Sequence, residues 1–241
     1  MLYIACLILL HHRVVKNDTF TSVKMEQLEK GIRTLTHDWR NVLNGINLRI
    51  AAAAYAEKPA DCESDLKDAQ QLITAATGEL SALSRKLSTP EITPISYPAA
   101  FFIEDLQAYL SQQLTLNALQ LDWKKSELSQ NVIVDFVAIS QAVMELVGNA
   151  LRHLVPNGRI SVSASESDGF LNLSLEEKKT ADLEPNDWGL APFSTTEKSR
   201  MGLGIFFVRR VLAAHGGRLQ FAFSTEEKIL KTTLQIPLEV A

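Results

Sequence analysis

Cysteine is scarce in this chain: among 241 residues there are two, Cys6 and Cys62, far apart in the sequence. Two such residues provide neither a disulfide framework nor the closely spaced ligand pairs of a zinc site, which suits a reducing interior. An excess of basic residues is also lacking, because 24 lysines and arginines stand against 28 aspartates and glutamates. The sequence therefore lacks the basic surface typical of proteins that bind nucleic acid, and we expect no nucleic-acid partner.

The apolar run at the start of the chain, residues 1–10, is too short to cross a bilayer alone, because a transmembrane helix needs about 20 apolar residues. Arg13 and Lys16 follow it, so the run could be the last half of a membrane helix with basic residues on the cytoplasmic side. No small-residue cleavage site follows, which argues against a removable signal peptide. Residues 1–18 are thus interpreted either as a membrane-proximal segment or as a helical start buried against a neighbour.

The chain does have a long pattern of apolar residues spaced alternately three and four apart, which is the seam of a packed helical bundle. In the first stretch, residues 19–56, no proline interrupts the pattern and a run of alanines at 51–54 favours helix. The apolar positions are Met25, Leu28, Ile32, Leu35, Trp39, Val42 and Ile46. The pattern predicts one long helix.

A second stretch repeats this spacing after a turn at residues 57–61. Its apolar positions are Leu66, Ala69, Ile73, Ala76, Leu80, Leu83 and Leu87. Two such helices joined by a short connection form an antiparallel helical hairpin, which we place at residues 19–89. One hairpin cannot bury both seams well, so we expect a homodimer in which two hairpins form a four-helix bundle. The alternative is that the hairpin packs on the chain's own second domain.

Prolines between residues 90 and 98 end the helical pattern and predict a linker there. Beyond it, residues 99–241 mix helices with short alternating strands. We expect helices at 99–114, 136–154 and 204–214, and strands at 119–123, 132–134, 159–165, 170–176, 218–223 and 230–236. This order predicts an α+β class with an α/β sandwich, in which a mixed, largely antiparallel sheet is covered by helices on one face.

His37 lies on the long N-terminal helix, roughly opposite the seam residues Leu35 and Trp39 at about 100° per residue. The stripe that it shares is polar and includes Asn41 and Asn44. A histidine on this face is not needed for packing and is accessible to another protein. Taken alone, it is either a chance surface histidine or a site of chemistry.

On the helix at 136–154, several polar residues lie away from the apolar stripe. Glu145 and Asn149 are one turn apart, and a carboxylate and an amide at this spacing can hold hydrated Mg²⁺, which prefers oxygen ligands and carries triphosphate with it. Arg152 and His153 follow, where they could reach phosphate oxygens. A solvated helix face is the alternative interpretation of the same spacing.

Gly202-Leu203-Gly204 opens the next helix. Glycines there let backbone amides approach an anion at the positive end of the helix dipole. The stretch before it, residues 192–200, is polar and has the composition of a lid over a nucleotide. The combination indicates a phosphate site more strongly than the two glycines alone.

These motifs, in this order, resemble the transmitter core of bacterial sensor histidine kinases over nearly the whole chain. His37-Asp38-x-x-Asn41 is similar to the family's phosphoacceptor box, and Glu145–His153 to its N box. Pro192–Lys198 is similar to the F box, and Gly202–Gly204 to the second glycine box. The resemblance implies a dimerisation and phosphoacceptor hairpin followed by a GHKL-type ATP-binding catalytic domain.

The resemblance also implies a role for each matching residue. His37 takes the γ-phosphoryl group, Asp38 acts as base or orients the imidazole, and Asn41 positions water for dephosphorylation of the response regulator. Glu145 and Asn149 hold Mg²⁺. The implied nucleotide-binding residues are Glu145, Asn149, Arg152, His153, Glu176, Thr195, Thr196, Lys198, Gly202, Leu203 and Gly204. The phosphoryl group would then pass to an aspartate in the receiver domain of a response regulator.

Two positions depart from the family pattern. Val42 stands where many members have a proline that kinks the helix. The first glycine box, Asp-x-Gly-x-Gly, is expected after the strand at 170–176, but residues 176–180 read Glu-Glu-Lys-Lys-Thr. Glu176 is the candidate to replace the aspartate that hydrogen-bonds the adenine amino group. Residues 187–191 read Asp-Trp-Gly-Leu-Ala, which is similar to this box, but they lie immediately before the F box and so do not fit the family's usual spacing.

The sequence thus predicts the core of a two-component sensor histidine kinase that autophosphorylates His37 with ATP and Mg²⁺. The alternative is an ATP-independent dimeric phosphotransfer protein with a degenerate nucleotide domain. No sensing domain is recognisable, so we expect the signal from another protein or from a membrane region outside this sequence. We expect a cytoplasmic location. A membrane-proximal segment at residues 1–18 would tether the protein to the inner face of the cell membrane.

Overall fold

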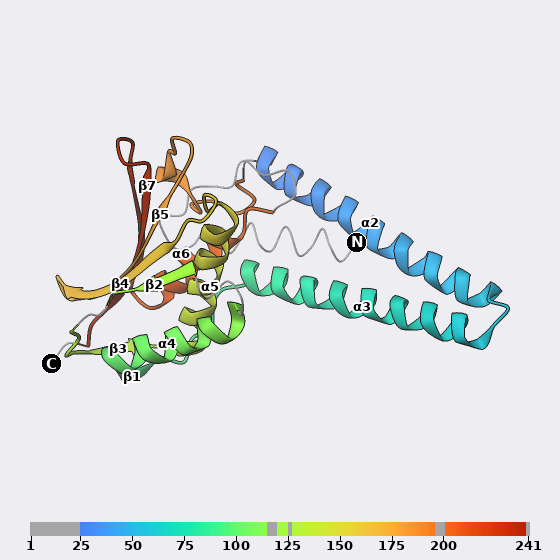
Figure 1. Ribbon diagram of the computed structural model, residues 1–241, viewed down its shortest axis with the longest axis horizontal. Helices are drawn as coiled ribbons and strands as arrows, with labels where there is room; N and C mark the ends of the chain where they lie inside the picture. Colours follow the sequence, from blue (N-terminus) through green and yellow to red (C-terminus); the bar gives the residue numbers. More distant parts are fainter. Residues whose placement is uncertain (1–24, 115–119, 125–126, 196–200, 240–241) are drawn as a thin grey trace. The chain divides into compact units, whose positions relative to one another are not determined.

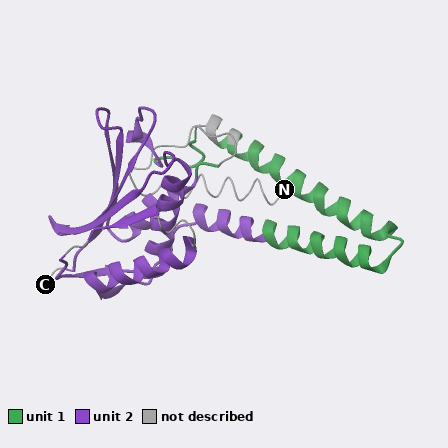
Figure 2. Ribbon diagram, in the orientation of Figure 1, with its two compact units in different colours: residues 1–76, 190–202 green, residues 77–189, 203–241 purple. Residues whose placement is uncertain are grey.

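The computed structural model describes residues 25–114, 120–124, 127–195 and 201–239 (Figure 1). It divides into two compact units (Figure 2). Unit 1 contains the described residues up to 76 together with 190–202, and unit 2 contains residues 77–189 and 203–241. The apolar segment 1–18, Thr196 and Lys198 lie outside the described residues.

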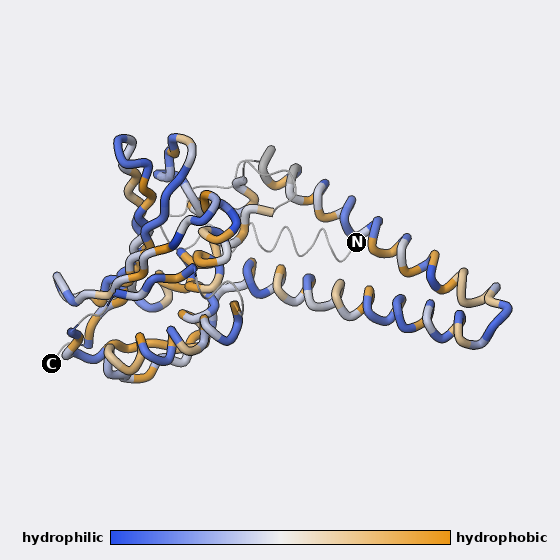
Figure 3. Tube along the Cα trace, in the orientation of Figure 1, coloured by the Kyte–Doolittle hydropathy of each residue, from blue (hydrophilic) through white to orange (hydrophobic). Residues whose placement is uncertain are grey.

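Unit 1 is built on helix α2, Met25–Tyr55, and the first part of α3, Pro59–Leu87. Apolar and polar residues alternate along both helices (Figure 3), and Arg49 of α2 binds Asp65 of α3 with an N–O distance of 3.0 Å. α3 begins at Pro59, inside the predicted turn, because the fixed φ of proline suits the first turn of a helix. The dimeric four-helix bundle stays a prediction, since it requires a second chain.

The sheet of unit 2 has the strand order β2-β4-β5-β7-β6. Its strands are β2 Leu121–Trp123, β4 Ile160–Ser167, β5 Phe170–Lys178, β6 Arg218–Ser224 and β7 Ile229–Pro237. β2 runs parallel to β4, and the remaining pairs are antiparallel. The mixed, largely antiparallel sheet predicted from the sequence is confirmed.

Three helices, α4 Ala99–Leu114, α5 Phe136–Arg152 and α6 Gly204–Ala214, supply the apolar residues that cover one face of this sheet (Figure 1). On that face the alternating residues Leu171, Leu173 and Leu175 of β5 are at most 2% exposed. The other face is polar, and there Ser174 Oγ lies 3.1 Å from Thr233 Oγ1 of β7. An antiparallel sheet with one packed face and one polar face produces this alternation.

Two segments differ from the sequence prediction. Strand β1, Ile95–Pro98, lies inside the predicted linker and pairs antiparallel with β3, Asn131–Val134. Proline is tolerated in a short edge strand, but in the sequence the same residue predicts a linker. Strand β5 runs past its predicted end to Lys178, because β7 continues to pair with it through Leu230 and Ile229.

Candidate functional site

Helix α5 carries the predicted metal ligands, and its first turn is capped by Asp135. The two carboxylate oxygens of Asp135 accept hydrogen bonds from the amides of Ala138 and Thr93, both at 3.0 Å. Burial opposes the ionised carboxylate, but these backbone hydrogen bonds outweigh it and lower the pKa of Asp135. The apolar face, Ile139, Ala142, Val143, Leu146, Val147 and Ala150, is buried, so Glu145 and Asn149 are left half-buried outside it.

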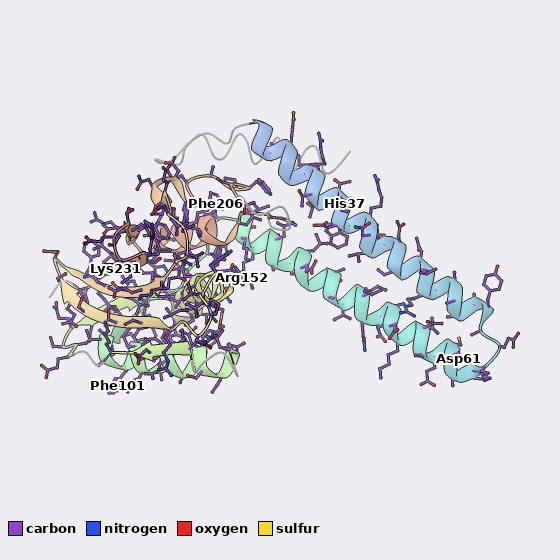
Figure 4. The ribbon with its side chains drawn as sticks, turned by 45° about the horizontal axis from the view of Figure 1, so that its top comes forward. His37, Asp61, Phe101, Arg152, Phe206 and Lys231 are labelled. Carbon is purple, nitrogen blue, oxygen red and sulfur yellow. The ribbon has the colours of Figure 1, made fainter. Side chains whose placement is uncertain are left out.

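Glu145 and Asn149 lie beside the start of α6. Glu145 Oε1 is 2.6 Å from Nζ of Lys86 in the last turn of α3, while a Cβ on Gly204 would lie 2.9 Å from Oε2. The same Cβ would lie 3.7 Å from Nδ2 of Asn149, whose Oδ1 accepts a hydrogen bond from Arg152 at the end of α5 (Figure 4). Four predicted residues therefore meet in unit 2, together with Lys86, which the sequence analysis missed.

The N-terminus of α6 approaches this pair because its first residue is Gly204. The preceding residue, Leu203, is the N-cap, and its apolar side chain makes no capping hydrogen bond. The first amides of the helix thus lack a side-chain acceptor from the N-cap, which is the condition under which a helix start binds an anion. A carboxylate, an amide oxygen and a helix N-terminus can together hold a cation and the phosphate groups that come with it.

Two glycines with positive φ flank the segment at 190–202. Gly189 has a φ of +70° and Gly202 a φ of +64°. An added Cβ would overlap Ile205 at the first position and the backbone of Ser194 at the second. Each position therefore needs glycine both for its conformation and for the close approach. Of the predicted nucleotide-binding residues Thr195, Thr196 and Lys198 in this segment, Thr195 is among the described residues, and it is half-buried in unit 1.

Two neighbouring arginines of α6 hold backbone segments of unit 2. Arg209 Nε donates to the carbonyl of Trp188 at 2.6 Å, just before Gly189. Arg210 Nη1 donates to the carbonyl of Leu87 at 2.7 Å, at the end of α3. Desolvation by burial lowers the pKa of both guanidinium groups, which stay charged at neutral pH. Arg210 thereby places the last turn of α3, with Lys86, against α6.

His37 is exposed on α2, as its position in the heptad pattern predicted, with 70% of its side chain accessible (Figure 4). Its Nδ1 is 3.3 Å from Asp38 Oδ1 and 3.3 Å from Asn41 Nδ2. When Nδ1 carries the proton, it donates a hydrogen bond to Asp38 Oδ1, and the lone pair of Nε2 remains available. The three predicted phosphoacceptor residues thus form one cluster in unit 1.

The two glutamates near the end of β5 point to opposite faces of the sheet. Glu176 is on the polar face and lies 3.2 Å from Nζ of Lys231 of β7. Glu177 continues the buried alternation of β5, is 7% exposed, and lies 2.6 Å from Nζ of Lys179. The residue predicted from the sequence was Glu176, but the period of two, continued by two residues from Leu175, places Glu177 on the inward face.

The chain is similar in sequence and in fold to known proteins. Residues 134–240 match the family model of histidine kinase-, DNA gyrase B-, and HSP90-like ATPases. The sensor histidine kinase ZraS of Escherichia coli K12 is 28% identical over 217 residues, which are 86% of this chain and 44% of ZraS. The adaptive-response sensory kinase SasA of Prochlorococcus marinus is 23% identical over 221 residues, covering 85% of this chain and 57% of SasA. The chain therefore spans about half the length of the curated relatives that it matches.

Solved structures share the fold. The histidine kinase AdeS of Acinetobacter baumannii aligns with a TM-score of 0.54 at 16% identity, over 85% of this chain and 98% of AdeS. Full-length ShkA in complex with AMPPNP aligns with a TM-score of 0.59 at 19% identity, over 91% of this chain and 47% of ShkA. At these identities the likeness concerns the fold. In sequence and fold, the chain is similar to bacterial sensor histidine kinases, and its residues 134–240 match the ATPase family model that these proteins share with DNA gyrase B and HSP90.

Proposed function

We propose that the chain is the kinase core of a two-component system, which transfers the γ-phosphoryl group of Mg²⁺-ATP to His37 and then to an aspartate of a response regulator. One observation carries the proposal: Glu145 and Asn149 lie at the glycine-opened N-terminus of α6. A protein that only relayed phosphoryl groups through His37 would need no such site. The similarity to ZraS and SasA supports the same activity class.

The donor set at Glu145 and Asn149 fits Mg²⁺ that arrives with a nucleotide. Mg²⁺ in proteins commonly takes one or two carboxylates, keeps several waters and binds substrate phosphates. In the described part of the chain no group of three or more His, Cys, Asp or Glu residues could enclose a metal ion. Bound there, Mg²⁺ would neutralise charge on the phosphate oxygens. Arg152, His153 and the first amides of α6 would bind the phosphate groups themselves.

The chemical step requires an unprotonated nitrogen on His37. Its Nε2 lone pair forms the bond to the γ-phosphorus, while the bond from that phosphorus to the β–γ bridging oxygen breaks and ADP leaves. Asp38 accepts a hydrogen bond from Nδ1–H and stabilises the positive charge that the ring gains. The phosphohistidine then donates its phosphoryl group to a receiver aspartate, and His37 is regenerated.

The helical surface of unit 1 supports dimerisation. Large apolar side chains on α2 and α3 are exposed in the single chain, among them Ile32, Leu43, Leu48, Ile50, Leu66 and Ile73. A second copy would cover them in the proposed four-helix bundle. Within the described residues, no helix is long and apolar enough to cross a membrane. A tether through residues 1–18 stays a prediction.

The ATP-independent phosphotransfer protein is the second candidate, and one observation favours it. The buried carboxylate of Glu177 is bound by Lys179, where the family pattern has a glycine. An ammonium group on that carboxylate competes with any amino group of a nucleotide base. This pair would weaken adenine binding without affecting His37.

The deciding experiment is labelling with γ-³²P ATP and Mg²⁺. We expect the wild type to label itself and His37→Gln to lose the label. Thr36→Ala is the matched control, because Thr36 is exposed beside His37 and its hydroxyl bonds only within the helix, to the carbonyl of Ile32. If the wild type binds no Mg²⁺-ATP but accepts phosphate from a phosphorylated receiver domain, the phosphotransfer protein replaces the kinase.

A further inference from the structure

A lysine in the last turn of α3 forms an ion pair with Glu145, the predicted carboxylate ligand of Mg²⁺. Lys86 Nζ is 2.6 Å from Glu145 Oε1, and the two side chains are 21% and 26% exposed. A lysine ammonium is a compact point charge, so it can stand in for a metal ion on a single carboxylate oxygen. Glu145 Oε2 meanwhile lies against Gly204. Lys86 and the start of α6 thus lie against the two different oxygens of the same carboxylate.

Lys86 and Mg²⁺ would compete for the single negative charge of Glu145. Mg²⁺ would bind a carboxylate oxygen at about 2.0–2.1 Å, and it would repel an ammonium group in hydrogen-bond contact with the same carboxylate. Loading of the site must therefore move Lys86 away from Glu145 or be opposed by it. Because Lys86 lies in the last turn of α3, its displacement acts on that turn within unit 2.

We propose that Lys86 is a latch that Mg²⁺-nucleotide must open: it neutralises Glu145 in the empty site and is displaced when the site is loaded. The inference rests on the proposed function, because it takes Glu145 as the metal ligand. Arg210 continues to hold the carbonyl of Leu87 and the hydroxyl of Thr89, so the turn loosens while remaining attached to α6. The coupling is reciprocal: the ion pair between Lys86 and Glu145 weakens nucleotide binding by the same factor by which the bound nucleotide weakens the ion pair.

The test compares Lys86→Met with Arg85→Met in the full chain. Arg85 is exposed in the same turn of α3, and its replacement removes the same unit of positive charge. Both variants lose long-range attraction for an anionic nucleotide, so their difference reports the contact with Glu145. We expect Lys86→Met to bind Mg²⁺-AMPPNP about twofold to fivefold more tightly than Arg85→Met, which is the range for a partly exposed ion pair. Isothermal titration calorimetry at fixed salt measures both affinities.

Equal affinities of the two variants would overturn the latch. Weaker binding by Lys86→Met would overturn it as well, since it would make Lys86 a phosphate ligand. If neither variant nor the wild type binds the analogue, the proposed kinase fails together with the latch. Binding without the expected difference refutes the latch alone.

Hydrogen exchange provides a second readout that does not depend on catalysis. In the wild type, Mg²⁺-AMPPNP should accelerate amide exchange in residues 84–88, and in Lys86→Met these amides should exchange faster already in the empty protein. Arg85→Met should behave like the wild type. Slower or unchanged exchange on loading of the wild type would contradict displacement of Lys86.

Discussion

Asp135 joins three parts of unit 2, which makes its replacement a sharp test of how the candidate site is held. Its side chain caps α5 through Ala138 and binds the amide of Thr93, while its own amide donates to Nε2 of His215 at 3.0 Å. Loss of an N-cap side chain costs about 0.5–2 kcal/mol, and loss of a further hydrogen bond about 1 kcal/mol. We expect Asp135→Ala to lower the free energy of unfolding by about 2 kcal/mol.

For a unit of this size, a loss of about 2 kcal/mol corresponds to a Tm lower by about 4–8 °C. Asp135→Asn separates the cap from the charge, because asparagine also caps helices well. We expect it to lose less than about 1 kcal/mol. Asp122→Asn, on the exposed face of strand β2, is the control for a change of one charge and should leave the Tm unchanged. Differential scanning calorimetry of the full chain measures all four proteins.

The pH dependence follows from the lowered pKa of Asp135 in the folded state. A carboxyl whose pKa is lower when folded stabilises the protein fully above its unfolded pKa of about 4, and this contribution is lost as the pH falls through the folded pKa. The Tm difference between wild type and Asp135→Asn should therefore shrink as the pH drops below about 5. A difference that persists unchanged at pH 3, or an Asp135→Ala protein that melts within about 1 °C of the wild type, would refute this account of the cap.

Three other variants test the site and the core. Gly204→Ala should reduce the affinity for Mg²⁺-AMPPNP at least tenfold in calorimetry with little change in Tm, because its methyl group would press on Glu145 Oε2. Unchanged binding would show that the start of α6 is not part of the nucleotide site. Glu177→Gln should cost about 3–5 kcal/mol in denaturant unfolding, because it leaves the ammonium group of Lys179, whose side chain is 10% exposed, without its counter-charge. The added Lys179→Met change should restore most of that loss, and additive losses would contradict the pair. Leu173→Ala, at a position with 0% exposure, should cost about 2–5 kcal/mol by the same measurement, and a loss below 1 kcal/mol would place Leu173 outside the core.

The sequence alone determined features that depend on local periodicity. The spacing of three and four placed His37 away from the seam of α2, and its side chain is exposed. The same reasoning put Glu145 and Asn149 one turn apart outside the apolar face of α5, where they are half-buried. Alternation and turn residues predicted the hairpin of β4 and β5, because both signals lie within a few neighbouring residues.

Tertiary structure decided the features that depend on partners distant in sequence. Strand β1 exists because β3 pairs with it, and β5 extends to Glu177 and Lys178 because β7 offers matching hydrogen-bonding groups. That extension keeps Glu177 within the strand, on the face that Leu171, Leu173 and Leu175 share. No local pattern marks a strand whose end is set by its neighbour.

The ion pair of Lys86 and Glu145 shows the same division at the candidate site. The sequence predicted Glu145 as an oxygen ligand from its spacing to Asn149, but it contained no sign that a lysine of α3 would neutralise it. The helical period predicts on which face of its own helix a residue lies. The residue that contacts it from another helix is set by tertiary packing. Candidate residues for phosphoryl transfer could therefore be proposed from the sequence, while the contact proposed to control loading of the site emerged only from the fold.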